Sequence, residues 1–308
     1  MIIEVNNLVK RYKELIALDH FRLEVEEGEI LGLLGPNGSG KTTAINCMLA
    51  LLTYDKGDIR IFGKQMKADS YDLKQQIGVV PQNVAVFHEL SVEDNINYFC
   101  GLYVSDKRKT LVDEAIRFVS LEEFRKFRPG KLSGGLLRRL NIACGIAHQP
   151  KLIFMDEPTV AVDPQSRNAI LEGIRRLNAQ GATIVYTSHY MEEVEEICSR
   201  IIIIDKGKTI AAGSKEELKA GIMMKEKIEV EQVKLQEQQV QDIQDIANVF
   251  SVQYNANVLQ VKFTEGKRNL ANLLDYFTQE NITYGKVYSQ QPTLNDVFLE
   301  ITGKQLRD

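Results

Sequence analysis

The run from Gly35 to Thr42 has the residue types and spacing of a phosphate-binding loop. It satisfies the pattern G-x-x-x-x-G-K-[ST]. Glycines let backbone N–H groups approach phosphate oxygens, because no Cβ stands in the way. Lys41 would supply a positive charge to the β- and γ-phosphates, and the hydroxyl of Thr42 would ligate Mg²⁺. We therefore expect phosphate contacts from Gly35, Pro36, Asn37, Gly38, Ser39, Gly40, Lys41, Thr42 and Thr43.

A second set of chemical groups lies at Asp156 and Glu157. They follow four apolar residues, Leu152–Met155, which are typical of a buried strand. Beside a phosphate loop, Asp156 is suited to positioning Mg²⁺, and Glu157 would lie next to the γ-phosphate. There the Glu157 carboxylate would orient or deprotonate the attacking water. The pair therefore predicts hydrolysis as well as binding.

These groups need strands and helices to position them. The first two-thirds of the chain alternates sequence patterns typical of strands with patterns typical of helices. The phosphate loop follows an apolar strand and precedes a helical stretch, Thr43–Leu52. Several strand candidates are continuous apolar runs, as expected for strands buried on both faces of a largely parallel sheet. The expected strands are Ile2–Val5, Phe21–Val25, Glu29–Leu34, Asp58–Phe62, Ile77–Val80, Lys151–Met155, Thr183–Thr187, Ile201–Asp205 and Lys208–Ala212.

The rest of the chain indicates two further parts. Between Gln82 and Pro150 the strand pattern disappears, and Asp106–Phe127 and Ser133–His148 are expected to be helical. Composition then changes near Ala220, and the tail is expected to follow approximately the order βαββαβ plus a helix. Its expected elements are a strand at Ile228–Val230, a helix at Val240–Phe250, a strand at Leu259–Phe263, a helix at Leu270–Phe277, a strand at Ile282–Val287 and a helix at Leu294–Ile301.

Composition excludes several classes of protein. The 308 residues carry 38 Lys+Arg and 42 Asp+Glu, a formal charge of −4, and 44% are hydrophobic. This is ordinary globular composition, not that of a collagen-like, disordered or disulfide-scaffold chain. Mild acidity without a block of like charge argues against a nucleic-acid partner. The four cysteines include no CxxC pair, no signal peptide is evident, and no apolar run approaches the roughly 18 residues of a membrane helix. We expect a soluble chain that works at a membrane only through other subunits.

A third motif, Leu132–Gly135, reads Leu-Ser-Gly-Gly. With the phosphate loop and the Asp156–Glu157 strand in this order, about residues 1–215 resemble the nucleotide-binding subunit of ABC transporters. The resemblance implies a P-loop NTPase core that binds ATP and Mg²⁺. It also implies that a second ATP-binding subunit, identical or different, associates head-to-tail. The helix start at Ser133, Gly134 and Gly135, itself suited to anions, would then cover the partner's ATP.

The resemblance assigns further residues singly. Tyr12 would stack on adenine, and Asp163 would lie in the loop that crosses the dimer interface. Gln82 would sense Mg²⁺ and the water and link to the membrane subunit, and His189 would contact the γ-phosphate. The implied catalytic residues are Glu157, His189, Gln82 and Lys41, and the implied metal-binding residues are Thr42, Gln82 and Asp156.

Two positions depart from the family pattern. Leu136 stands where Gln is usual and Met occurs, and Ala161 stands where Gly is frequent. Neither departure removes a charge that would touch phosphate. Hydrolysis is therefore still expected, with slower turnover or altered dimer closure as the alternative.

Two stretches indicate the class of transporter. Phe87–Ile96 resembles the family's groove for a coupling helix, and within it Ser91 is a plausible N-cap with Asp94 at N3. Pro292–Gly303 resembles the C-terminal accessory domain of the type-2 export group, which serves drugs, antibiotics, sodium and polysaccharides. We expect an ATP-hydrolysing subunit, peripheral on the cytoplasmic face of the membrane, that powers export through separate transmembrane permease subunits.

Two alternatives remain at this point. One is an importer ATPase whose C-terminal domain senses a ligand. The other is a soluble ABC-type ATP switch acting on ribosomes, DNA or cofactor assembly, against which the acidic balance and the lack of a basic stripe weigh. The transported molecule would contact the permease and is not identified by this chain.

The expected fold is α/β. A P-loop NTPase core with a mixed, largely parallel sheet would occupy 1–215, with a helical subdomain inserted at about 83–150. A small α+β accessory or regulatory domain would occupy 222–308.

Overall fold

The computed structural model describes residues 1–303. The chain divides into two compact units, 1–215 and Glu216–Gly303. Residues 304–308 of the second domain expected from the sequence lie outside the described part of the chain. Within 1–303, no helix combines the length and the apolar character needed to cross a membrane.

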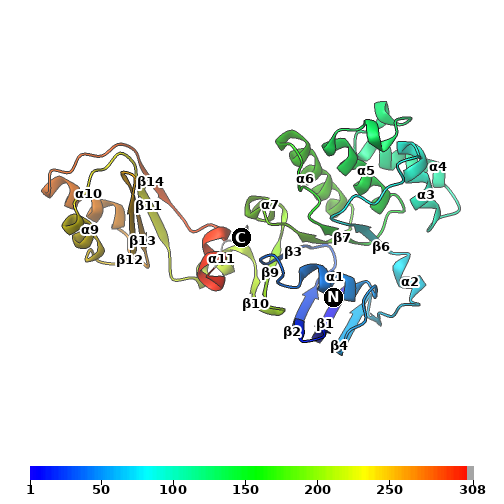
Figure 1. Ribbon diagram of the computed structural model, residues 1–308, viewed down its shortest axis with the longest axis horizontal. Coiled ribbons are helices and arrows are strands. Elements are labelled where there is room, and N and C mark those ends of the chain that lie inside the picture. Colours follow the sequence, from blue (N-terminus) through cyan, green and yellow to red (C-terminus); the bar gives the residue numbers. More distant parts are fainter. Residues whose placement is uncertain (304–308) are drawn as a thin grey trace. The chain divides into compact units, whose positions relative to one another are not determined.

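A six-stranded sheet forms the centre of the first unit (Figure 1). In spatial order its strands are β10 (Lys208–Gly213), β9 (Arg200–Asp205), β3 (Ile30–Leu34), β8 (Thr183–Thr187), β7 (Leu152–Asp156) and β6 (Ile77–Val80). All neighbours are parallel except β10, which runs antiparallel to β9. β3, β7 and β8 are buried along their whole length, which explains their continuous apolar sequences. The largely parallel sheet expected from the sequence is confirmed.

A second, antiparallel sheet completes the core. Its strands in order are β2 (Leu15–Val25), β1 (Ile3–Tyr12), β4 (Lys56–Ile61) and β5 (Lys64–Gln65). Apolar side chains of both sheets and of helix α1 (Lys41–Met48) share one hydrophobic cluster, in which Ala44 and Met48 are fully buried. α1 is thus fixed between the sheets, and the loop that precedes it is fixed with it.

The segment between β6 and β7 is helical and contains no strand among its described residues. Its helices are α3 (Val92–Gly101), α4 (Arg108–Phe118) and α5 (Gly134–Ile146), with 3₁₀ turns at Glu122–Phe124 and Pro129–Lys131. Ser91 caps α3 as expected, because its hydroxyl accepts the N–H of Asp94 at 3.2 Å. The stretch Asp106–Phe127, expected to be helical, is so only in part: α4 ends at Phe118, Ser120 takes a left-handed φ of 56°, and a 3₁₀ turn follows at Glu122–Phe124.

Three more helices complete the first unit: α2 (Tyr71–Lys74), α6 (Pro164–Ala179) and α7 (Met191–Ile197). Asp163 is the N-cap of α6, and its carboxylate accepts the N–H of Ser166 at 2.9 Å. Pro164 at the first helical position has the fixed φ that suits a helix start.

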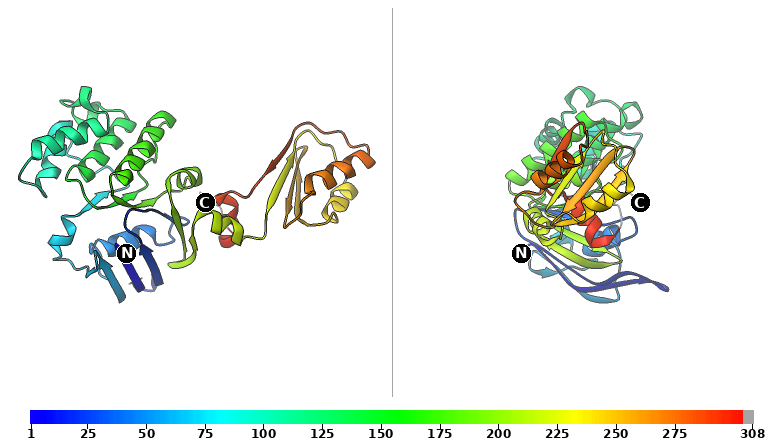
Figure 2. Two further views of the ribbon diagram at one scale, coloured as in Figure 1. Left: turned by 180° about the vertical axis from the view of Figure 1, so that it is seen from behind. Right: turned by 90° about the vertical axis from the view of Figure 1, so that its left-hand side faces the viewer.

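The second unit has the order βαββαβ plus a final helix. Its elements are α8 (Lys215–Gly221), β11 (Glu226–Val230), α9 (Glu237–Gln244), β12 (Val249–Asn255), β13 (Val258–Phe263), α10 (Asn269–Gln279), β14 (Val287–Gln290) and α11 (Leu294–Thr302). The antiparallel sheet has the order β12-β13-β11-β14, and α9 and α10 lie against one of its faces (Figure 2). Ile228, Val261, Phe263 and Phe277 are fully buried in the core between these layers.

Two expectations for the second unit are corrected. The helix expected over Val240–Phe250 ends at Gln244, since Asn248 takes a left-handed φ of 68° and Phe250 belongs to β12. The strand expected at Ile282–Val287 begins only at Val287, because the register that pairs β14 with β11 starts there.

Replacing Phe263 by Ala should destabilise the second unit by about 3–5 kcal/mol, because it leaves a cavity in a fully buried core. Phe250→Ala is the matched control, since that ring is 39% exposed. Calorimetry of the full chain should show a lower melting transition for Phe263→Ala alone. Equal losses in both variants would contradict the assignment of this core.

Candidate functional site

The candidate site forms where four parallel strands end side by side. The phosphate loop follows β3, Glu157 follows β7, Gln82 comes shortly after β6, and His189 shortly after β8. Register places Thr187 opposite Asp156. Because parallel strands end at the same edge of a sheet, groups from distant parts of the chain meet there.

The phosphate loop has a backbone that only a few residue types permit. Gly40 has a φ of 110°, and a Cβ there would lie 2.6 Å from the backbone oxygen of Ala17. α1 begins directly after it, so the first N–H groups of the helix face the loop. The buried hydroxyl of Ser39 has no hydrogen-bond partner among the described residues. A bound phosphate oxygen would satisfy such a group, so the loop fits a nucleotide phosphate.

Lys41 is held inside its own loop. Its side chain is buried, and Nζ donates to the backbone oxygens of Gly35 at 2.7 Å and Pro36 at 3.2 Å. Burial lowers the pKa of Lys41, while Glu157 and Asp156 act in the opposite direction. Phosphate oxygens carry negative charge and are stronger partners for an ammonium group than carbonyls. The charge of Lys41 is thus available where phosphate would lie.

Hard oxygen ligands gather beside the loop. The hydroxyl of Thr42 donates to Asp156 Oδ2 at 3.2 Å, and Thr187 Oγ1 donates to Asp156 Oδ1 at 2.6 Å. A hydroxyl, a carboxylate and the amide oxygen of Gln82 are the ligand types that Mg²⁺ prefers, and nucleotide phosphates and water commonly supply the rest. The donor set therefore fits Mg²⁺. Its chemistry there would be to neutralise charge on the phosphates.

The Glu157 carboxylate is held from two sides. Gln82 Nε2 donates to Glu157 Oε2 at 2.8 Å, and His189 Nδ1 lies 3.4 Å from Oε1. The Glu157 backbone takes a left-handed φ of 49°, and its N–H donates to the hydroxyl of Thr187 at 3.0 Å. Such a φ is uncommon for a residue other than glycine and is often found at functional sites. The structure thus brings together Gln82, Asp156, Glu157 and His189 beside Thr42.

Ser133, Gly134 and Gly135 lie at the start of α5, where Ser133 is the N-cap. The Ser133 hydroxyl accepts the N–H of Leu136 at 3.3 Å. A Cβ on Gly135 would lie 2.6 Å from Ser166 Oγ and 3.2 Å from Asp163 Oδ2, so the motif borders the start of α6. Hydrogen bonds lower the pKa of Asp163, that from the backbone N–H of Ser166 most. Within 1–303, no hydrogen bond joins Ser133–Gly135 to the phosphate loop.

The two departures from the family pattern have different structural effects. At Leu136 the backbone supplies the N–H that Ser133 caps, so the change of side chain leaves the cap intact. Ala161 has a φ of 58°, a left-handed conformation that glycine adopts more readily than alanine. The frequency of glycine at this position thus has a backbone explanation.

Tyr12 lies at the end of β1 and is 43% exposed. Lys10 Nζ lies 5.1 Å from the centre of its ring. No hydrogen bond among the described residues joins Tyr12 to the Glu157 cluster. Its ring is available for stacking on a planar group, as aromatic rings at surface sites often are.

The sequence did not single out three residues that hold the site together. Thr187 forms hydrogen bonds to both Asp156 and Glu157. The sequence offered one signal for this role, a threonine at the end of an apolar strand. Arg138 Nη1 donates to the backbone oxygen of Gln82 at 2.6 Å, and Asn141 Nδ2 donates to that of Pro81 at 3.1 Å. Burial lowers the pKa of Arg138. Both side chains come from α5, so the helix that Ser133 opens is tied to Gln82.

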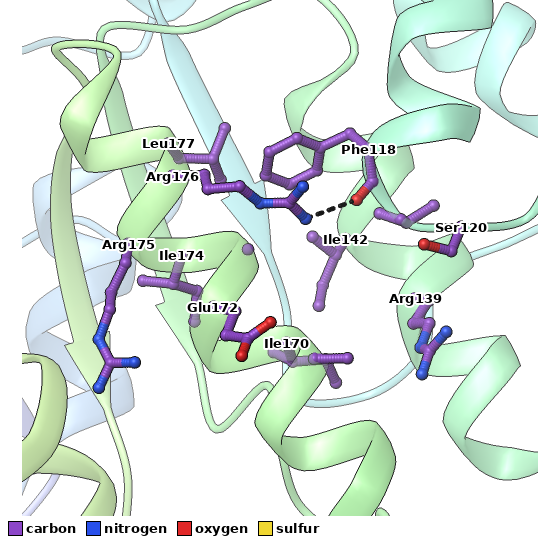
Figure 3. A pocket seen from close by; sticks show the side chains of 13 residues that line it. Phe118, Ser120, Arg139, Ile142, Ile170, Glu172, Ile174, Arg175, Arg176 and Leu177 are labelled. Atoms are coloured by element: carbon purple, nitrogen blue, oxygen red, sulfur yellow. Dashed lines mark hydrogen bonds between the residues drawn. The ribbon is translucent and has the colours of Figure 1, made fainter.

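A cavity of about 530 Å³ lies elsewhere, between α4, α5 and α6 (Figure 3). Phe118 and Ile170 are among its lining residues, and Arg176 Nη2 donates to the backbone oxygen of Phe118 at 3.1 Å. None of the residues at the strand ends lines it. The candidate site is therefore the strand-end cluster.

Family models match both units. Residues 18–160 match the model described as "ABC transporter", and residues 213–302 match "ATP-binding protein DrrA1-3-like, C-terminal domain". The linearmycin resistance ATP-binding protein LnrL of Bacillus subtilis is 35% identical over 311 residues, which cover 100% of both chains. The Nod factor export ATP-binding protein I of Ralstonia nicotianae is 32% identical, over 100% of this chain and 95% of the relative.

Solved structures match the first unit. An ATP-binding subunit of an ABC transporter is 25% identical, with a TM-score of 0.66 over 71% of this chain and 92% of that one. A dimeric ATP-binding cassette in a post-hydrolysis state, bound to ADP and Pi, is 27% identical. Its TM-score is 0.64 over 69% of this chain and 98% of that one.

Thr187→Val should weaken Mg²⁺ binding about tenfold or more, because it removes the hydroxyl that orients Asp156. A titration of ATP binding with Mg²⁺ measures the change. Thr183→Val is the matched control: it lies in the same strand and is equally buried, but its hydroxyl accepts the N–H of Gly28. Equal Mg²⁺ affinity in the two variants would show that Thr187 does not orient the metal ligand.

Proposed function

We propose that this chain powers export through separate membrane permeases. It belongs to the ABC transporter family and is an ATP-binding, ATP-hydrolysing subunit. ATP is hydrolysed in this family's reaction, and Mg²⁺ is the metal cofactor. The observation that carries the proposal is the position of Gln82, which directly follows the groove residue Pro81 and donates a hydrogen bond to Glu157. The assignments of single residues below are part of the proposal.

The phosphate loop and Lys41 would bind the β- and γ-phosphates. Thr42, Asp156 and the amide oxygen of Gln82 would hold Mg²⁺. Thr187 fixes Asp156, so this ligand keeps its orientation before nucleotide binds. Such preorganisation lowers the cost of assembling the site during the reaction.

Glu157 would accept a proton from the attacking water or orient that water. Gln82 donates to one of its oxygens and His189 lies next to the other, so the carboxylate direction is set from both sides. His189 would also contact the γ-phosphate. A positioned general base contributes roughly 10²–10⁴-fold to a rate.

The motif at Ser133 would bind the nucleotide of a second subunit. It opens a helix, where N–H groups favour anions, yet it borders Asp163 and Ser166 of its own chain and not its own phosphate loop. Ser133 and Asp163 are both exposed, as an interface requires. A head-to-tail dimer, whether of identical or different subunits, would place this motif over the partner's ATP, with Tyr12 stacked on adenine in the cradle of the same chain.

The permease would dock on the helical segment between β6 and β7. Exposed aromatic and aliphatic side chains gather there: Phe87 lies against Tyr98 with ring centres 4.8 Å apart, and Leu102 is 59% exposed. Beside them is a groove of about 210 Å³ that includes Pro81, Ala85, Phe99 and Tyr103 among its lining residues. An amphipathic helix in a cytoplasmic loop of the permease suits a groove with apolar walls.

The groove lies one residue away from a hydrogen-bond partner of Glu157. Pro81, which lines it, precedes Gln82, and Gln82 donates to Glu157. Arg138 of α5 holds the backbone oxygens of both Pro81 and Gln82. A partner helix that shifts this segment would therefore shift both the Glu157 partner and the helix that Ser133 opens.

The direction of transport is proposed as export. The match of the second unit to the DrrA1-3-like C-terminal domain supports this direction, as do relatives named for linearmycin resistance and Nod factor export. The subunit would be peripheral on the cytoplasmic face of the membrane.

Glu157→Gln should preserve ATP binding, reduce turnover at least about a hundredfold and trap an ATP-bound dimer, because the amide cannot accept the proton. Phosphate release and light scattering measure the two effects. Undiminished hydrolysis would contradict the role of Glu157.

The double variant Ser133→Arg and Glu157→Gln is the control for the dimer. The long cationic side chain at an exposed interface position should block closure, so that the protein binds ATP as a single subunit. If ATP-dependent dimers persist, the cross-subunit role of Ser133 is wrong.

Leu102→Asp should lower recovery of the chain with its coexpressed permease about tenfold or more, because docking would bury the exposed Leu102 side chain and burial of a leucine contributes about 1.5–3 kcal/mol. ATP hydrolysis without permease should not change. Ile210→Asp, at an exposed position on β10, is the control and should copurify normally. Normal recovery of Leu102→Asp would exclude the exposed apolar side chains beside this groove as the docking site.

A further inference from the structure

We propose that Glu193 is a positioning residue, which holds the loop of His189 to the loop that runs from Glu157 to Asp163. The inference rests on the function proposed above, since it concerns how His189 and Asp163 are placed. Glu193 lies on α7 and is 2% exposed, yet it belongs to none of the three sequence motifs.

Three hydroxyl groups donate to a single oxygen of this carboxylate. Glu193 Oε2 accepts from Thr159 Oγ1 at 2.8 Å, from Tyr186 at 2.7 Å and from Ser188 Oγ at 2.8 Å. The donors come from the loop after β7, from β8 and from the turn after β8. One buried acceptor therefore joins three segments that end at the reaction centre.

The other oxygen faces α6. Arg167 Nε lies 3.3 Å from Glu193 Oε1, and the Arg167 guanidinium lies over the ring of Tyr190, 4.3 Å from its centre. The backbone N–H of Arg167 donates to the backbone oxygen of Asp163 at 2.9 Å. Through Arg167, the carboxylate is connected to the residue that caps α6 and lies in the proposed interface loop.

The connections end next to the reacting groups. Ser188 immediately precedes His189, and its hydroxyl also accepts the N–H of Tyr190, so it fixes the turn that carries the imidazole. Thr159 lies between Glu157 and Asp163. A displacement of Asp163 at a dimer interface would therefore reach His189 through Arg167, Glu193 and Ser188.

The cluster has three hydroxyl donors and one carboxylate oxygen that accepts from all of them. Burial and Glu193 raise the pKa of Tyr186 well above its usual value, so this hydroxyl stays a donor. The other two hydroxyls also donate to the carboxylate. A buried carboxylate is costly unless it is paired and hydrogen-bonded. An apolar residue would fill the same space at lower cost, but it would not fix two loops relative to each other.

The test compares the removal of one donor at a time. Thr159→Val and Ser188→Ala each cut a connection to one loop, whereas Tyr186→Phe cuts a bond of similar length to the interior of β8. We expect about tenfold lower kcat for the first two, with the Kd for ATP unchanged within about twofold. Tyr186→Phe should keep its kcat within about twofold, although thermal unfolding shows a similar loss of stability. A merely structural role predicts equal effects in all three, and either equal kcat losses or full activity of Thr159→Val and Ser188→Ala would overturn the proposal.

Glu193→Gln and His189→Ala separate this inference from the function it rests on. Single-turnover phosphate release should fall about tenfold or more in each, and the double variant should lose less than the product of the two single losses, because part of the Glu193 effect passes through His189. Multiplied losses in the double variant would contradict the positioning role. Full activity of His189→Ala would instead contradict the proposed role of His189. If Glu193→Gln does not fold, the three single-donor variants still decide the question.

Discussion

The burial of two adjacent carboxylates constrains the whole first unit. Asp156 is 9% exposed and Glu157 is 7% exposed, at the end of a strand without any exposed residue. Ionised groups in such a place must be hydrogen-bonded or paired with opposite charge. The strand order meets this requirement because it brings the ends of β3, β6 and β8 to the same edge. The hydroxyls, the amide, the imidazole and the ammonium group that surround the pair are therefore also what makes its burial possible.

The same requirement explains why the site is sensitive to distant events. Glu157 has partners on two different loops, so neither loop can move without changing the surroundings of the carboxylate. One of these loops reaches a groove on the helical segment, and the other reaches α6 through Glu193. Discrete hydrogen-bonded arrangements of this kind can link sites that share no direct contact.

Sequence patterns predicted most of the fold and the main groups of the site. Runs such as Leu152–Met155 predict buried strands, and parallel strands bring their carboxyl ends to the same edge of the sheet. The break after Phe118 was missed because Ser120 has no strong turn signature, although it adopts a left-handed conformation. Thr187, Arg138 and Glu193 were missed for another reason. Their importance depends on which distant atoms they meet, and spacing along the chain carries no information on that.

Ala161 imposes a free-energy cost on the backbone of the loop between Glu157 and Asp163. An L-residue in the left-handed region costs about 1 kcal/mol or somewhat more, and glycine would not incur this cost. Ala161 is exposed and lies in the loop between Glu157 and the start of α6. Any arrangement of this loop that returns Ala161 to ordinary backbone angles therefore gains the same free energy, whereas a glycine at this position would gain nothing.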